Sequence, residues 1–487
     1  MGRYAEAERT IMVVKDAYGL ENSENFESLL ATYSLAQLYD AQGDSRKAID
    51  MIKSIEASVH RQFGAGHSFL PSAQLSRAKS HQKLGEFDVA NAILKELLDS
   101  QTVLWGSDHR ETLAVNSAIA ALYANQGLFE SAAAKYRELD FVYRRDAEQN
   151  SLLSLLNRLH LAETDLDLNR LEEAQLAAKQ VLHDMVNELG EDSLFTHSAM
   201  MVLGEIYHAN DNYESAIEIF QRALAGMREC VSDDHPVALE LMAILGIALV
   251  DSGQLDLAEP LLQESFDRSL ATRGSNDPVT AITVEALSKY ELAQNELSNA
   301  ESHLRQTLSV FTKFREANHY LPLHTQAVLG RVLFLRGKYA EAEIELTHAL
   351  DGQLLARGTD HSVVHSNIDD LAELMIAQKR FVDGEELLRK TLDVLDAKHS
   401  DKWEAYRSKS LLGAALLGQQ EFDEAEFCLL EAIEGLEQRR TKIPYIERTV
   451  IRDAVEQTVL LYTNWDRKAD AEKWRQVLQR LEHRQQL

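Results

Sequence analysis

The most regular feature of this chain is a turn residue that recurs about every 42 residues, with apolar residues at helical spacing on both sides. Most turn residues are Gly, Asn or Asp, which tolerate the left-handed backbone that ends a helix. Consecutive turns lie 41 or 42 residues apart, except for a last spacing of 46 residues. The turn positions are Gly2, Gly43, Gly85, Gly127, Asn169, Asp211, Gly253, Asn295, Gly337, Lys379, Gln420 and Asp466.

Two columns of small residues accompany the turns. Five residues after each turn stands Ala or Gly, and seven residues before it stands Ala, Gly or Ser in all but the last repeat. Two antiparallel helices joined by a tight turn approach closely only where neither carries a bulky side chain. The pattern therefore predicts an all-α chain of helical hairpins, with roughly 23 helices and no sheet.

We predict one continuous solenoid over residues 1–487, because repeat proteins grow by adding units rather than separate cores. It comprises an incomplete first repeat (1–24), ten full repeats (25–440) and a divergent terminal repeat (441–487). Met1 directly precedes the turn residue Gly2, so the first helix of that hairpin is missing. We expect a fragment or a start codon placed too far downstream, with a bare helix face open to end-to-end self-association.

The linkers between hairpins carry another column, in which Ser and Asp suit a helix N-cap. Its members are His67, His109, Ser151, Ser193, His235, Asp277, His319 and His361. His361 and His365 are four residues apart, a spacing that can hold a metal on one helix face. No HExxH motif or Cys/His cluster accompanies them, so we predict linker caps and no metal site.

The order small residue, turn, aromatic residue, Ala appears in LAQLYDAQGDSRKA (35–48) and AALYANQGLFESAA (120–133). It resembles the tetratricopeptide repeat, and the 42-residue version with a linker such as SDDHPVA (232–238) is similar to the repeats of kinesin light chains. The resemblance implies an α-α superhelix that recognises protein or peptide partners on its concave face. Residues 410–439 also resemble the last repeats of the tail of bacterial serine/threonine protein kinases.

Charge and composition narrow the function further. The net charge of −28 disfavours nucleic acid and anionic membranes, which bind cationic surfaces. Only two cysteines are present, and no signal-type apolar stretch opens the chain, so we expect a cytoplasmic protein. The most apolar run, Leu241–Val250, is too short to span a bilayer. A nucleophile elbow, a phosphate loop and kinase motifs are missing, so we predict no enzyme activity and no cofactor.

Positions six and ten residues before each turn should face or flank the concave groove. We expect Glu163 and Glu205 to pair with a basic peptide, and Lys289 with Arg331 to hold a carboxylate. The alternative is that these charges are solvated or pair within and between repeats. The candidate groove residues are Tyr33, Gln37, Lys79, Glu163, Met201, Glu205, Glu285, Lys289, Arg331, Asp369 and Glu373.

Three functions remain open at this stage. The first is a non-catalytic scaffold or regulatory module that binds protein or peptide partners. The second is the repeat region of a bacterial serine/threonine kinase whose catalytic domain is missing from this chain. The third is a sensor of short peptides, which predicts one compact, closed groove.

Overall fold

The structure is a computed structural model, and it describes residues 8–13, 26–41, 44–64, 66–145, 151–314, 320–398 and 401–485. Every regular element in these ranges is a helix. Residues 8–13 are helical and contact α2 (Phe26–Ala41), where Tyr39 Oη donates a hydrogen bond to Glu8 Oε1 at 2.7 Å. The predicted turn residues Gly2 and Gly43, the linker residue His319 and most of the incomplete first repeat lie outside the described residues.

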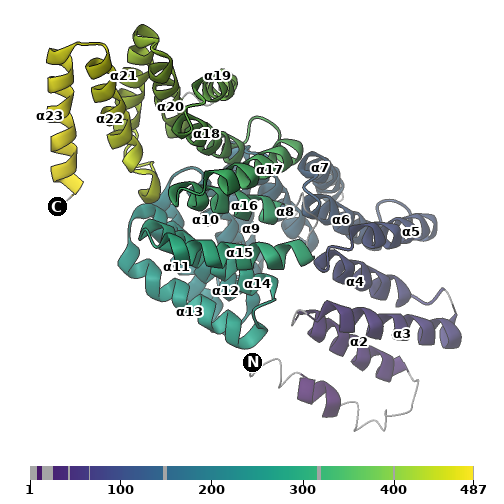
Figure 1. Ribbon diagram of the computed structural model, residues 1–487. Helices are drawn as coiled ribbons and strands as arrows, with labels where there is room; N and C mark the ends of the chain where they lie inside the picture. Colours follow the sequence, from purple (N-terminus) through teal and green to yellow (C-terminus); the bar gives the residue numbers. More distant parts are fainter. Residues whose placement is uncertain are drawn as a thin grey trace.

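Antiparallel hairpins follow one another along the chain (Figure 1). The first helices are α2, α4 (Leu70–Lys83), α6 (Arg110–Asn125), α8 (Leu152–Asp167), α10 (Leu194–Ala209), α12 (Pro236–Ser252), α14 (Pro278–Ala293), α16 (Tyr320–Leu335), α18 (Ser362–Ala377), α20 (Trp403–Gln419) and α22 (Thr449–Asn464). The second helices are α3 (Ser45–Phe63), α5 (Phe87–Trp105), α7 (Phe129–Arg145), α9 (Leu171–Leu189), α11 (Tyr213–Cys230), α13 (Leu255–Arg273), α15 (Leu297–Phe314), α17 (Tyr339–Arg357), α19 (Phe381–Lys398), α21 (Phe422–Gln438) and α23 (Lys468–Gln485). A short 3-10 helix, η1 (Tyr445–Glu447), lies between α21 and α22.

The predicted turn column is confirmed by the backbone. All ten of its members within the described ranges have positive φ, from Gly85 to Asp466. Lys379 and Gln420 adopt φ of 64° and 67° although neither residue type favours this region. The turn geometry of the hairpin therefore overrides the residue preference at these two positions.

The small columns are confirmed by the packing of each hairpin. Ala132, Ala174 and Ala216 are completely buried. A Cβ atom placed on Gly204 would lie 2.3 Å from Phe220 Cε1, and one on Gly246 would lie 2.3 Å from Leu262 Cδ2. The two helices of these hairpins therefore approach so closely that only glycine fits on the first helix.

The linker column caps the first helices. His109, His235 and His361 each accept, at Nδ1, a hydrogen bond from the backbone N–H two residues later. Asp277 does the same with its carboxylate, at 2.9 Å from Val279 N. Ser193 occupies the N-cap position without a side-chain bond. Histidine thus serves here as a neutral cap acceptor, which keeps the linker conformation constant from repeat to repeat.

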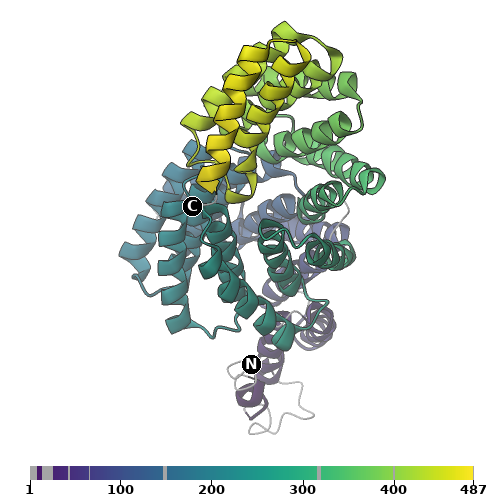
Figure 2. The same cartoon turned by 60° about the vertical axis from the view of Figure 1, so that its left-hand side comes forward.

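The hairpins wind into a superhelix in which the first helices face inward (Figures 1 and 2). The end of α17 contacts the end of α8, where Asn169 Nδ2 donates a hydrogen bond to Asp360 O at 3.1 Å. Farther along, Lys402 Nζ lies 3.6 Å from Asp211 Oδ2. Residues about 190 positions apart therefore meet, and successive turns of the superhelix contact each other around a central channel. None of the helices described combines the length and the apolar character needed to cross a membrane.

Candidate functional site

The central channel contains a partly enclosed cavity of about 480 Å³. Its wall is built from the inward faces of α10, α12, α14, α16 and α18, and the C-terminal hairpins complete it. Aliphatic side chains form much of the wall, namely Ile244, Ile247, Ile282, Leu292, Val328, Val363 and Ile446. We call this space the inner cavity.

The two sets of positions predicted to face the groove, six and ten residues before each turn, both contribute residues to the inner cavity. Four candidate residues line it, from three of the first helices: Glu205 on α10, Glu285 and Lys289 on α14, and Arg331 on α16. The stacking of hairpins therefore converts a repeat spacing in sequence into neighbours on one wall. What each side chain can offer a ligand depends on whether it already has a partner within the chain.

Lys289 is already paired. Its Nζ lies 2.6 Å from Oδ2 of Asp251, which also accepts a hydrogen bond from His208 Nε2 at 2.7 Å. Asp251 is 1% exposed, and burial alone would raise its pKa. Lys289 and His208 outweigh burial and bring the pKa of Asp251 below its usual value. Asp251, Lys289 and His208 therefore form a structural contact that joins α12, α14 and α10.

Glu285 also has hydrogen-bond partners within the chain. Its Oε1 accepts hydrogen bonds from His324 Nδ1 at 2.9 Å and from Thr325 Oγ1 at 3.0 Å. Both partners lie on α16, the next first helix along the chain. Glu285 therefore joins two repeats.

Arg331 and Glu373 form an ion pair with each other, at 2.5 Å between Nη1 and Oε2. Arg407, which is buried, adds a second guanidinium, 2.6 Å from Asp370 Oδ1 and 3.8 Å from Glu447 Oε2. The expectation that Lys289 and Arg331 hold an external carboxylate is therefore corrected, because both cations already have carboxylates from neighbouring repeats.

Asp369 requires a second correction. It is 1% exposed and accepts a hydrogen bond from Ser408 Oγ at 2.7 Å, between α18 and α20. Burial raises its pKa to about 7 despite the nearby Arg407. The position ten residues before the turn faces the neighbouring helix in this repeat rather than the channel.

Glu205 differs from all of these residues. Within the described ranges it has no hydrogen-bond or ion-pair partner, and its side chain is half-buried at the cavity wall. The channel walls surround it, so burial, followed by the charges of Glu163, Asp167 and Glu240, raises its pKa to about 8. Glu205 is thus a carboxylate whose ionised form lacks a counter-charge, and a cation placed in the cavity would supply one.

The remaining candidates lie nearer the N-terminal end. Tyr33 Oη donates a hydrogen bond to Ser72 O at 3.1 Å and can accept one from Ser76 Oγ at 2.9 Å, which joins α2 to α4. Glu163 pairs with His160 three residues earlier, at 2.8 Å. The other three are placed as follows: Gln37 and Lys79 are exposed, and Met201 packs partly buried against the central hydrophobic core.

Electrostatics distinguish the inner cavity from a purely apolar pocket. Its lining carries five carboxylates, from Glu205, Asp251, Glu285, Asp370 and Glu447, but only the cations Lys289 and Arg331 besides two histidines. The wall therefore has excess negative charge next to aliphatic surface. A ligand that combines a positive group with apolar groups complements both properties.

Histidine and cysteine residues elsewhere have structural contacts. His365 Nε2 hydrogen-bonds to Thr359 O at 2.8 Å, and His361 contacts Arg357 at 2.7 Å as well as capping α18. Cys428 is buried and Cys230 half-buried. Among the residues described, His, Cys, Asp and Glu side chains do not gather in threes with the arrangement that would hold a metal ion.

Sequence reasoning missed the C-terminal contribution to the cavity. Trp403, Pro444, Ile446 and Glu447 complete the wall, although they come from repeats about 200 residues beyond α10. The one signal for this was the last turn spacing, of 46 rather than 42 residues. The additional residues fall in the connection between α21 and α22, which contains η1.

Comparison with known proteins identifies the repeat. Tetratricopeptide-repeat family profiles match residues 159–230, 195–271, 239–313 and 323–343. None of the curated proteins matches the sequence significantly.

Among solved structures, a Rap protein complexed with Competence and Sporulation Factor has a TM-score of 0.55 at 15% identity, covering 77% of this chain and 98% of its own. A kinesin-light-chain-like repeat protein from Podosopora anserina has 20% identity and a TM-score of 0.37 over 42% of this chain and 98% of its own. BtubC (BKLC) from P. vanneervenii has 20% identity and a TM-score of 0.37 over 50% of this chain and 92% of its own. At these identities the likeness concerns the fold.

Proposed function

We propose that this chain, in which residues 159–313 and 323–343 match tetratricopeptide-repeat profiles, is a non-catalytic binding protein for a basic peptide segment. The segment would be short, or an extended part of a larger protein, and would occupy the inner cavity. The partner would present Lys or Arg beside aliphatic side chains. Neither Cys230 nor Cys428 is joined in a disulfide, which suits a reducing compartment, and we propose that binding takes place in the cytoplasm.

The observation that carries this proposal is Glu205 in the inner cavity. It is the candidate groove carboxylate that lines this cavity and lacks a partner within the described ranges, whereas Glu285 has partners on α16. A Lys or Arg side chain would give it the missing counter-charge. The walls of the channel screen this pair from bulk water, so it contributes more than an ion pair on an open surface.

Affinity would come mainly from apolar contact. Removing two charges from water costs free energy that offsets much of their attraction, so the pair with Glu205 selects the partner without holding it tightly. The aliphatic wall formed by Ile244, Ile247 and Ile282 buries the side chains that flank the basic residue. A partly enclosed cavity of this kind also fits the peptide-sensor hypothesis better than an open groove does. The similar Rap structure is itself a complex with Competence and Sporulation Factor, which supports ligand binding by a superhelix of this fold.

The test is binding of fluorescein-labelled hexapeptides, measured by fluorescence anisotropy. One set carries a central Lys or Arg flanked by Leu, Ile or Val, and a matched set carries Glu at the centre. We expect the basic set to bind and the acidic set not to bind. Glu205→Lys should abolish binding, since it places a like charge at the site.

The control is Glu218→Lys, which makes the same charge change on α11 of the same hairpin, where Glu218 is exposed on the outer surface. It should leave binding unchanged. Equal binding of the basic and acidic hexapeptides would refute the proposal, because charge would then not select the partner. Equal loss in both variants would also refute it, because net charge rather than the cavity would then explain the result.

A further inference from the structure

The connection between α21 and α22 reaches across a full turn of the superhelix. We call residues 442–448 the roof segment. Tyr213 Oη donates a hydrogen bond to Lys442 O at 3.2 Å, and Arg448 Nη2 donates one to Ser252 O at 3.3 Å. In Figure 1 this connection descends from the C-terminal hairpins to the teal helices α11 and α12. It therefore joins the last hairpins to the middle of the chain.

The roof segment also packs closely. A Cβ atom on Gly253 would lie 2.9 Å from Tyr445 Cδ2, so the turn between α12 and α13 accepts Tyr445 only because it has no side chain. Ile446 packs against the central hydrophobic core, and Ile443 is completely buried in the C-terminal core. The segment is thus held by apolar contacts on both sides of the gap that it bridges.

The same segment completes the inner cavity. Pro444, Ile446 and Glu447 contribute to its lining, together with Trp403 at the start of α20. Glu447 lies 3.8 Å from Arg407, which contacts Asp370 in the cavity wall. The cavity is therefore composite: one wall belongs to α10–α18, and the other exists only while the roof segment is docked.

Resting on the proposed function, we propose that the roof segment is part of the peptide site and that peptide binding and roof docking are coupled. A peptide whose Lys or Arg meets Glu205 would place its neighbouring aliphatic side chain between Ile247 and Ile446. Thermodynamic linkage then requires that the peptide stabilise the docked roof, and that undocking weaken the peptide complex by the same factor. Peptide binding in the inner cavity would thereby stabilise the contact of the C-terminal hairpins with the middle of the chain.

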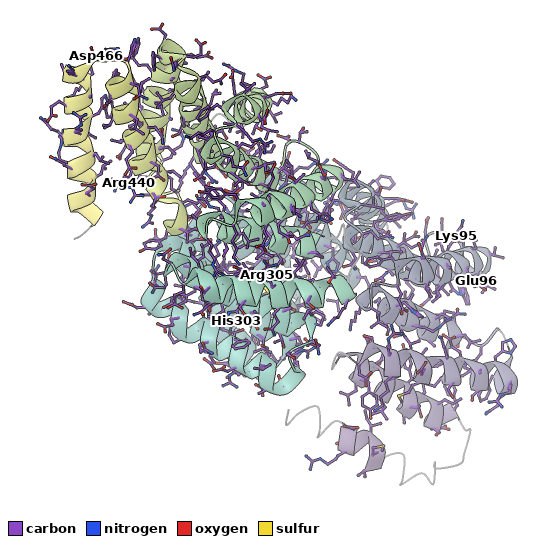
Figure 3. The ribbon with its side chains drawn as sticks, in the orientation of Figure 1. Lys95, Glu96, His303, Arg305, Arg440 and Asp466 are labelled. Carbon is purple, nitrogen blue, oxygen red and sulfur yellow. The ribbon has the colours of Figure 1, made fainter. Side chains whose placement is uncertain are left out.

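The experiment compares the wild type with the double variant Tyr213→Phe, Arg448→Ala, which removes the two side-chain hydrogen bonds that join the roof segment to α11 and α12. Its matched control is Arg440→Ala, in the same connection but at the lower end of α21 and α22 (Figure 3), where Arg440 pairs only at 3.6 Å with Glu437. The probe is the Lys-centred hexapeptide that binds best in the anisotropy assay. We expect the double variant to raise its Kd by roughly tenfold, from the loss of two partly buried hydrogen bonds. Arg440→Ala should leave Kd unchanged.

A second measurement uses the wild type alone, so it does not depend on a variant that folds. Hydrogen–deuterium exchange of residues 442–448 should slow when the Lys-centred hexapeptide is added, and should not change with the Glu-centred one. If the hexapeptide binds through Glu205 while the double variant has the wild-type Kd and exchange is unchanged, the coupling is refuted and the proposed function stands. If no hexapeptide binds, both proposals fall together.

Discussion

Arg357, at the end of α17, donates a hydrogen bond from Nη2 to Asp167 Oδ1 at 2.9 Å, although 190 residues separate the two. Its Nη1 also donates to the backbone oxygen of Asp167 at 3.2 Å, and its guanidinium lies 5.0 Å from the centre of the Phe129 ring. One side chain thus closes one turn of the superhelix onto the next. The enclosed channel, and with it the inner cavity, depends on contacts of this kind.

We predict that Arg357→Ala opens the superhelix. The variant should lose about 1–3 kcal/mol of unfolding free energy, the usual worth of hydrogen bonds to charged groups. Its radius of gyration in small-angle X-ray scattering should increase, since the turns separate. The control Arg389→Ala removes contacts with Glu385 and Glu424, which lie on α19 and α21 rather than on a different turn. An unchanged radius of gyration for Arg357→Ala would contradict a closing role.

The hairpin was predictable because its determinants are local. A turn residue such as Asn169, at φ 58°, and a small residue such as Ala174 act within one repeat of the sequence. The same repeat spacing placed Glu205, Lys289 and Arg331 on one wall of the channel. These successes share a cause: each depends only on the geometry of one hairpin and its stacking on the next.

The contacts between turns were not predictable in this way. The superhelix closes only after several small rotations between repeats have accumulated, so no spacing in the sequence encodes the meeting of Arg357 with Asp167. Side-chain partners were also missed, as with Asp251, which pairs with Lys289 in the next repeat. The repeat spacing predicts where a charged residue lies on the channel wall. Whether that residue can bind a ligand depends on its partners in neighbouring repeats, which the spacing does not predict.

Ala216→Leu tests the packing of the hairpins. Ala216 is completely buried where α10 and α11 approach most closely, beside the pair of Gly204 and Phe220. Three additional carbon atoms must displace neighbouring side chains, and we expect a loss of about 1–3 kcal/mol in urea unfolding. Glu218→Leu on the same helix is exposed and should cost much less. Equal stability of the two variants would mean that the small columns do not mark the contact.

Asp251→Asn tests the paired part of the cavity. Asp251 is 1% exposed and neutralises Lys289, so its replacement leaves a cation in the wall without its carboxylate. Lys289 keeps 28% of its side chain exposed, so we expect a loss of about 1–3 kcal/mol, which thermal and urea unfolding should both show. Asp267→Asn on the outer helix α13 serves as the control, because Asp267 is exposed and accepts a hydrogen bond from Gln263 one turn earlier. Since the pKa of Asp251 is lowered in the folded state, its contribution is present at neutral pH and is lost on acidification.

Glu205 should show the opposite pH dependence. Its pKa rises from 4.5 to about 8 on folding, so between these values the unfolded chain releases a proton that the folded protein keeps. Stability attributable to Glu205 therefore falls as the pH rises through this window and levels off above about 8. Glu205→Gln does not titrate at this position. From pH 5 to pH 8 we therefore expect the unfolding free energy of the variant to increase relative to that of the wild type.

Peptide binding provides the independent half of this prediction. A Lys-centred hexapeptide keeps its positive charge up to about pH 10 and needs the ionised form of Glu205. Its affinity for the wild type should therefore rise between pH 6 and pH 9, while Glu205→Gln should bind weakly and without pH dependence. Folding stability and peptide affinity should therefore change in opposite directions as the pH rises. Loss of the Glu205 proton destabilises the empty protein, whereas the same loss creates the carboxylate that binds the peptide cation. If anisotropy titrations instead gave parallel pH profiles for wild type and variant, the titrating group would lie elsewhere and Glu205 would not be the counter-charge.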